Sequence, residues 1–235
     1  MRGRQLAGAE ALESYMATFK TYYFYEDSYY RYPLYDPDFL FGTTVYKKGA
    51  WVLHMLRHLG TDDDFFAMLR EYVEDDSDGL VTTEELISVA EGYYGGRGSL
   101  DDFFEQWVYM AGYPEYEVML WNEETSDGWL CHVQLSQVQD YSDDITPEVF
   151  STPVDLELAT AGGAVAVVFD NDRRVDEQAF SVPSAVTGLN FDPDGWLLYK
   201  LLNSDAPVVV FTAAPGEDGV LVAWSIAVPY THLRA

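Results

Sequence analysis

Two histidines, His54 and His58, stand four residues apart in a stretch with helical periodicity. On a helix this spacing turns both imidazoles to the same side, as in helices that bind zinc. A hydrolytic zinc helix also carries a glutamate directly after its first histidine, and this chain has Met55 there. Because no third ligand is evident, the pattern favours two histidines on a helix surface over a metal site.

An acidic segment, residues 74–85, has the spacing of a calcium-binding EF-hand loop, with Gly79 at its sixth position. The candidate calcium ligands are Glu74, Asp76, Asp78 and Glu85. The first of them is Glu where the loop geometry favours the shorter Asp, and no second loop pairs with this one. Thr82 and Glu85 also have the spacing of a capping box. The favoured interpretation is an acidic loop that ends in a helix cap, with calcium binding as the alternative.

Tyrosines crowd residues 22–35, which hold seven of the 18 in the chain. Their amphipathic rings could line a cleft for a sugar or a peptide. Such a segment more often packs as a long wrapping loop whose hydroxyls reach solvent, so we expect packing here.

Tyr46 comes at the start of the next helical stretch, within the sequence Val45-Tyr46-Lys47-Lys48-Gly49-Ala50. A phenol can donate a hydrogen bond, and the amide dipoles at a helix N-terminus favour negative charge nearby. By residue type alone this is a generic donor to an anion.

The elements that position these residues follow from the apolar pattern. Up to about residue 112, apolar side chains recur at three- and four-residue steps, which predicts one packed helical unit. The expected helices cover residues 9–19, 46–59, 61–72, 82–93 and 99–110. Gly60 is predicted as the C-cap of the second helix, and Thr61 as the cap of the third.

After Pro114 the apolar period becomes two, which predicts strands at residues 117–120, 129–135, 154–158 and 164–169. Short strands at this spacing favour an antiparallel β-sandwich. A further hairpin is predicted from residues 208–211 and 220–224. The fold class is thus α+β and multi-domain. The expected domains are a helical part at 1–114, a β-sandwich at 115–203 and the start of another β-domain at 204–235.

Composition excludes several classes of protein. The 235 residues carry 13 Lys and Arg against 40 Asp and Glu, a formal net charge of −27, with 48% hydrophobic residues. So large an apolar fraction excludes intrinsic disorder, and the negative charge argues against binding nucleic acid. No apolar run is long enough for a transmembrane segment, and the first residues do not form a signal peptide. A single cysteine, Cys131, excludes an internal disulfide and a thiolate metal cluster.

Residues 45–57 resemble the Y-x-K-G-A helix of the M1 zinc aminopeptidases, the gluzincin metallopeptidases that include leukotriene A4 hydrolase. Further pieces keep the order and spacing of that family. They are Leu59-Gly60 with Phe65-Phe66, residues 69–72, 81–86, 103–107 and Gly112-Tyr113-Pro114. The resemblance covers roughly residues 9–202, and the ordered set is more specific than any single piece.

This resemblance implies the helical C-terminal half of a catalytic domain, followed by the β-sandwich of these enzymes. The family hydrolyses peptides with zinc-activated water, using an H-E-x-x-H helix and a Glu on the next helix. Tyr46 matches the family tyrosine that donates a hydrogen bond to the tetrahedral oxyanion. The zinc motif and the G-A-M-E-N-type loop are missing and are expected upstream of residue 1. Zinc is therefore implied for a longer parent protein, with peptide substrates, while this N-terminally truncated chain is expected to be inactive alone.

Two alternatives stay open. The chain could be a calcium-binding module built on residues 74–85, although the resemblance implies an inter-helix loop without calcium there. It could also be a non-catalytic interaction scaffold that retains a peptidase fold. The acidic surface and appended β-domain would suit a secreted or periplasmic bacterial enzyme.

Overall fold

A computed structural model describes residues 8–74, 81–94, 99–202, 208–216 and 219–227 of the chain. The chain divides into two compact units. The helical unit consists of Met1–Gly112, Tyr141–Pro147 and Trp196–Leu198. The β unit consists of Tyr113–Asp140, Glu148–Gly195 and Tyr199–Ala235. The α+β class predicted from the sequence is confirmed.

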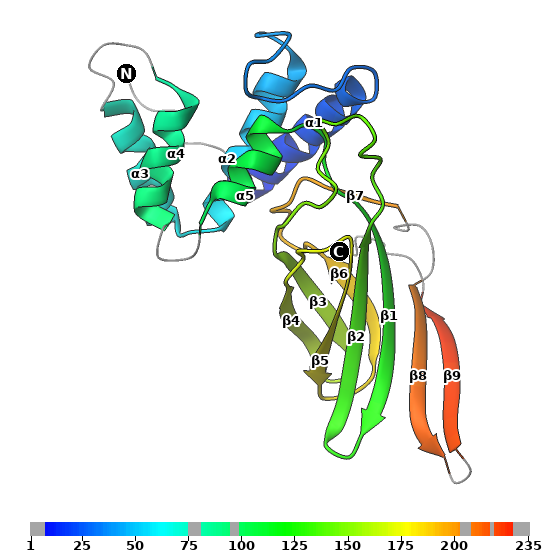
Figure 1. Ribbon diagram of the computed structural model, residues 1–235. Helices are drawn as coiled ribbons and strands as arrows, with labels where there is room; N and C mark the ends of the chain where they lie inside the picture. Colours follow the sequence, from blue (N-terminus) through cyan, green and yellow to red (C-terminus); the bar gives the residue numbers. More distant parts are fainter. Residues whose placement is uncertain (1–7, 75–80, 95–98, 203–207, 217–218, 228–235) are drawn as a thin grey trace. The chain divides into compact units, whose positions relative to one another are not determined.

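The helical unit is built from α-helices and two π-helical turns (Figure 1). In chain order they are α1 (Ala9–Asp27), η1 (Thr44–Lys48), α2 (Gly49–His58), α3 (Asp62–Glu74), α4 (Thr83–Tyr94), α5 (Asp101–Phe104) and η2 (Glu105–Tyr109). The η1 turn runs directly into α2, and η2 directly continues α5. Among the described residues, no helix is long and apolar enough to cross a membrane.

Local sequence accounts for the start of two of these helices. Thr61 accepts a hydrogen bond from the backbone N–H of Asp64 at 3.2 Å, which caps α3. Thr82 and Glu85 form the predicted capping box at α4, because each side chain accepts a hydrogen bond from the other's backbone N–H, at 2.7 and 3.2 Å. The predicted caps are therefore confirmed at both positions.

Gly60 has a different role from the one predicted. The C-cap of α2 is Leu59, and Gly60 is not in the left-handed region of backbone space. A Cβ at Gly60 would lie 2.2 Å from the ring of Tyr94. Glycine is needed here because Tyr94, the last residue of α4, packs directly against the chain after α2. Lack of space for a side chain therefore explains this glycine, and a left-handed backbone conformation does not.

Strands β1 to β9 form two sheets, both rich in antiparallel pairs (Figure 1). The strands are β1 (Glu115–Thr125), β2 (Gly128–Gln137), β3 (Val154–Thr160), β4 (Gly163–Phe169), β5 (Val175–Val182), β6 (Val186–Phe191), β7 (Lys200–Leu201), β8 (Val208–Gly216) and β9 (Gly219–Ala227). One sheet has the order β5-β2-β1-β8-β9, with β7 beside β1, and the other has the order β4-β3-β6. The β8 strand runs parallel to β1, whereas β9 is antiparallel to β8.

Side chains of the two sheets meet inside the β unit. Alternate residues of β1 and β2 are buried, as expected for strands with one face in a core. The rings of Tyr116 of β1 and Phe191 of β6 pack in a tilted arrangement, with their centroids 5.3 Å apart. Asn122 of β1 binds both backbone groups of Val186, accepting at 2.8 Å and donating at 2.9 Å. The buried polar side chain of Asn122 in the first sheet is thus satisfied by the second.

Three strands were not predicted. The β5 sequence has three consecutive polar residues, Asp176, Glu177 and Gln178, and only its last residue is buried. The β6 strand holds Gly188, and β7 has two residues. Polar, short or glycine-containing strands lack the apolar signal from which strands are inferred, so they become visible only through their partners.

Candidate functional site

Tyr46 lies in the middle of η1. Its side chain is 55% exposed, and its hydroxyl has no hydrogen-bond partner among the described residues. Turns of π-helix are rare and occur frequently at functional sites. The helical unit therefore presents a phenol that can donate a hydrogen bond to an added ligand.

Glu26 lies close to the end of α1, and its carboxylate accepts hydrogen bonds at the start of η1. It accepts hydrogen bonds from the Thr43 N–H at 3.0 Å, from the Thr44 N–H and from the Thr44 hydroxyl at 2.7 Å. Burial raises the pKa of Glu26, but the hydrogen bonds from Thr44 and Thr43 outweigh it and lower the pKa below its usual value. The carboxylate of Glu26 thus neutralises positive charge at this helix end, while the exposed phenol of Tyr46 can still donate a hydrogen bond to a ligand.

Lys48, two residues after Tyr46, is fully buried. Its Nζ donates a hydrogen bond to the backbone carbonyl of Met110 at 3.1 Å. Burial lowers the pKa of Lys48 to about 7, while the attraction of Asp27 raises it and the repulsion of Arg31 lowers it further. The end of η1 is therefore anchored by a side chain whose charge is costly in this environment.

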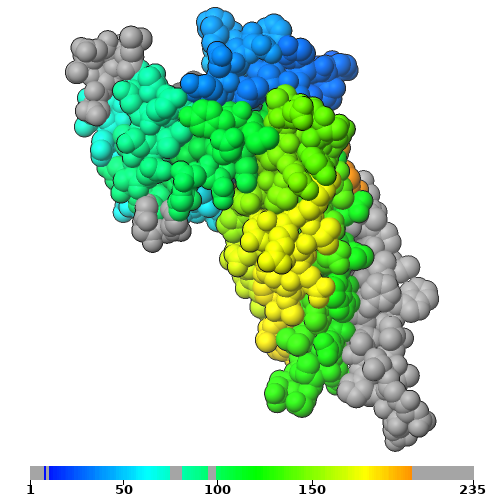
Figure 2. All heavy atoms as spheres, in the orientation of Figure 1, coloured from blue at the N-terminus to red at the C-terminus, as the bar shows by residue number. Residues whose placement is uncertain are grey.

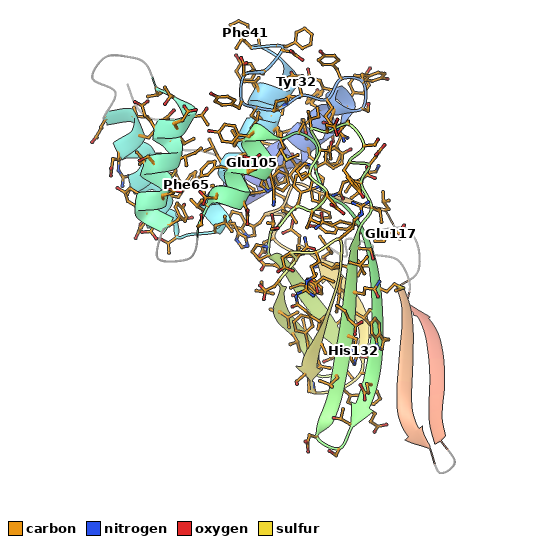
Figure 3. The ribbon with its side chains drawn as sticks, viewed as in Figure 1. Tyr32, Phe41, Phe65, Glu105, Glu117 and His132 are labelled. Carbon is orange, nitrogen blue, oxygen red and sulfur yellow. The ribbon has the colours of Figure 1, made fainter. Side chains whose placement is uncertain are left out.

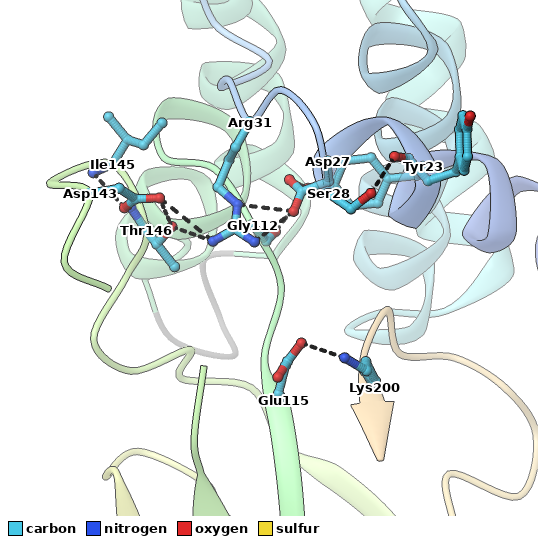
Figure 4. Close-up of polar contacts among 11 residues, drawn as sticks. Tyr23, Asp27, Ser28, Arg31, Gly112, Glu115, Asp143, Ile145, Thr146 and Lys200 are labelled. Carbon is cyan, nitrogen blue, oxygen red and sulfur yellow. Dashed lines mark hydrogen bonds and ion pairs between the residues drawn. The ribbon is translucent and has the colours of Figure 1, made fainter. Parts of the chain in front are cut away.

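A partly buried polar cluster surrounds the end of α1 (Figure 4). The guanidinium of Arg31 donates to Asp27 at 2.7 and 2.9 Å and to the Thr146 hydroxyl at 2.8 Å. Tyr23 donates to Asp27 at 3.1 Å and lies 3.2 Å from the carbonyl oxygen of Gly112. Asp143 lies 3.6 Å from Arg31 and accepts from the Thr146 hydroxyl. The cluster joins α1 to two distant segments of the helical unit.

Sequence reasoning missed both anchors of η1. Lys48 precedes the buried residues Trp51, Val52 and Met55 by three, four and seven positions, so helical periodicity would have predicted it on the buried face. That signal was available in the sequence. The Glu26 contact had no such signal, because its partners lie 17 and 18 residues along the chain.

His54 and His58 lie on α2 as predicted, and both rings stack on Trp196. The centroid distances are 4.6 and 4.8 Å, with interplanar angles of 23° and 10°. Within the part of the chain that the structure describes, no group of three or more His, Cys, Asp or Glu side chains is arranged to hold a metal ion. The pair thus packs against an indole.

The candidate calcium ligands are only partly described. Glu74 is exposed at the end of α3, and the carboxylate of Glu85 is engaged in the capping box of α4. Asp76 and Asp78 lie outside the described residues. Calcium binding by residues 74–85 stays a prediction.

The tyrosine segment differs from the expected wrapping loop. Its first part is helical, because α1 extends to Asp27. Tyr23 and Tyr32 are buried, with hydroxyls bonded to Asp27 and Glu26. Other aromatic side chains of α1 and the following loop are exposed, and Figure 3 shows Phe41 at an outer edge of the helical unit, where it is 86% exposed. In Figure 2 this blue segment covers one side of that unit.

An open pocket of about 320 Å³ lies elsewhere in the helical unit. Its lining residues are Ile87, Asp101, Asp102, Phe104, Glu105 and Tyr109. Tyr109 also packs against Tyr35 with the two rings tilted and their centroids 4.7 Å apart. The pocket combines carboxylates with aromatic rings, and sequence reasoning did not single it out.

Comparison with known proteins finds a family model that matches the segment containing Tyr46. Residues 30–107 match the model of the Peptidase family M1 domain. The fold is similar to the crystal structure of Legionella pneumophila aminopeptidase A in complex with aspartic acid, with a TM-score of 0.52 and 16% sequence identity over 69% of this chain. The chain spans 18% of the length of that protein. No curated protein sequence matches the chain. The predicted resemblance to the M1 peptidases is therefore confirmed.

Proposed function

We propose that this chain is part of an M1-type zinc aminopeptidase and that Tyr46 donates a hydrogen bond to the oxyanion formed during peptide hydrolysis. The observation that carries the proposal is the exposed phenol of Tyr46, which has no hydrogen-bond partner among the described residues, on a π-helical turn anchored at both ends. The M1 family match over residues 30–107, which includes this turn, supports it.

The chemistry required of Tyr46 follows from the reaction. Attack of water on a peptide carbonyl converts its oxygen into an oxyanion, so negative charge develops where the ground state had a weak dipole. A donor aimed at that oxygen binds the transition state more strongly than the substrate, and this difference lowers the barrier. Tyr46 keeps its proton and donates only the hydrogen bond.

The described residues do not fit a zinc site, because no suitable group of three ligands is present among them. In this proposal, zinc and the base that activates water belong to other parts of a longer protein. The isolated chain would then bind no stoichiometric zinc and would hydrolyse no peptide.

The β unit fits the same proposal. We infer that its two sheets form the β-sandwich that follows the catalytic domain in M1 peptidases, and the contacts of Tyr116 and Asn122 between the sheets support this. The division into parts at 1–114, 115–203 and 204–235 belongs to the proposal as well. So does a secreted or periplasmic location, which the net charge of −27 would suit.

The test is steady-state kinetics of the full-length gene product with aminoacyl-4-nitroanilides. We expect Tyr46→Phe to lower kcat by about 10²- to 10³-fold with little change in KM, because the lost bond acts mainly in the transition state. Tyr22→Phe is the matched control, since Tyr22 is similarly exposed at 57% but lies on α1. An unchanged kcat in Tyr46→Phe would show that the phenol has no catalytic role.

A further inference from the structure

The η1 turn exposes one side chain and buries another within three residues. Tyr46 is 55% exposed, whereas Lys48 has no exposed surface. Burying an amine is unfavourable unless something in the structure compensates for it, because its charged form loses its hydration. The position of Lys48 therefore needs an explanation beyond packing.

Compensation at Lys48 is incomplete. Among the described residues, its Nζ has one hydrogen-bond acceptor, the Met110 carbonyl at 3.1 Å, although an ammonium has three donors. Asp27 attracts the ammonium, but its carboxylate is already paired with Arg31 at 2.7 Å. Hence the site tolerates the neutral amine better than the ammonium.

The Lys48 contact lies at the second end of η1. Turns of π-helix are rare, and η1 has Glu26 bound at its start. Towards its other end, the Nζ of Lys47 lies 4.0 Å from the centre of the Phe19 ring on α1, and Lys48 donates to Met110, directly after η2. The backbone that carries Tyr46 is thus clamped between α1 and the end of η2.

We propose that Lys48 is a proton-sensitive positioning residue for Tyr46: its buried neutral amine fixes η1 against Met110, and uptake of a proton loosens the turn. The catalytic meaning rests on the proposed function of Tyr46, but the positional claim does not. The groups that bear on Lys48 are Asp27 on α1 and Arg31 beyond it, and Tyr23 and Asp143 complete their cluster.

The direction of the effect follows from linkage. In an opened η1 the amine would be solvated and would titrate near the ordinary lysine value of about 10.4. Because burial lowers the pKa of Lys48 to about 7, the closed turn binds its proton more weakly than the open one. Raising the pH above 7 therefore favours the closed turn, by up to tenfold per pH unit.

Two measurements on the chain itself test this. Selective ε-¹³C labelling gives signals from four lysines, Lys20, Lys47, Lys48 and Lys200. One signal should titrate near pH 7, and replacing each of the other three lysines with Arg assigns it to Lys48 without altering the buried site. Amide hydrogen exchange, corrected for the intrinsic rate, should then show protection of the η1 amides rising at least fivefold between pH 7 and 9.

Variants separate this effect from general stability. Lys48→Met, which keeps the volume and removes the charge, should abolish the rise in η1 protection. Lys47→Met is the matched control in the same turn and should retain it. Three outcomes would each overturn the proposal. They are a Lys48 signal that titrates near 10.4, η1 protection that does not change with pH in the unmodified chain, and a rise in protection that persists in Lys48→Met. Because none of these readouts involves turnover, they stand or fall separately from the role of Tyr46.

Discussion

Individual side chains around Tyr46 hold its backbone in place. Glu26 binds Thr43 and Thr44 at the start of η1, and Lys48 reaches Met110 at its end. These contacts leave the hydroxyl of Tyr46 open while they restrict the chain that carries it. A donor fixed in advance pays little reorganisation when charge develops on a substrate, which is the basis of electrostatic catalysis.

Lys48 should lower the free energy of unfolding at low pH, where its buried amine must carry a charge. Its folded-state pKa of about 7 is below the unfolded value, so between pH 7 and about 10 the unfolded chain binds a proton that the folded chain lacks. The free energy of unfolding then rises with pH in this window. We expect Lys48→Met to be more stable than the unmodified chain at pH 6, with the difference shrinking by about 1.4 kcal/mol per pH unit from pH 7 to 9.

Urea unfolding of both proteins at several pH values measures this difference. Lys47→Met serves again as the control, and its stability should stay parallel to that of the unmodified chain. A pH-independent difference between Lys48→Met and the unmodified chain would mean that Lys48 keeps an ordinary pKa in the folded state.

Among the secondary-structure elements, α4 depends on a local cap. The reciprocal bonds of Thr82 and Glu85 satisfy two backbone N–H groups at its start. Thr82→Ala should therefore lower the free energy of unfolding by about 1 kcal/mol. Thr83→Ala is the control, because Thr83 is the first residue of α4 and its side chain has no described hydrogen bond. Denaturant unfolding followed by far-UV circular dichroism distinguishes the two, and equal effects would remove the cap as the cause.

Elements with a local signal were predictable, and elements defined by distant partners were not. The apolar stripe of α2 and the caps at Thr61 and Thr82 are readable within one helical turn. Two other features could not be read in this way, namely the extension of α1 to Asp27 and the β5 strand, because their side chains are largely polar or exposed. At the site, Tyr46 was found through its family motif. Its anchors Glu26 and Lys48 became clear only when α1 and Met110 were seen beside η1.

For the whole molecule, the dominant physical feature is charge. The excess of 40 acidic over 13 basic residues makes the folded chain repel itself. Salt screens such repulsion, so the midpoint of thermal unfolding at pH 7 should rise when NaCl is increased from 10 to about 200 mM. The same salt step at about pH 4, where many carboxylates are protonated, should have a smaller effect. Calorimetry measures both, and a midpoint that falls with salt at pH 7 would contradict the expectation.

The contacts that anchor η1 and the family match fall in the same part of the helical unit. The match to the Peptidase family M1 domain covers residues 30–107, which include Tyr46 and Lys48. Glu26 and Met110, which hold the two ends of η1, lie four and three positions outside it. The function proposed for Tyr46 thus depends on contacts that the helical unit makes internally.

The most direct test of the role of Tyr46 is the affinity of the full-length gene product for a phosphinic peptide, whose tetrahedral phosphorus centre carries an anionic oxygen like that of the intermediate. Calorimetric titration should show that Tyr46→Phe weakens this binding by the same factor of about 10² to 10³ by which it lowers kcat, while the KM for the matching substrate stays nearly constant. Equal affinity of the phosphinic peptide for the unmodified protein and for Tyr46→Phe would contradict the assignment of Tyr46 as the oxyanion donor.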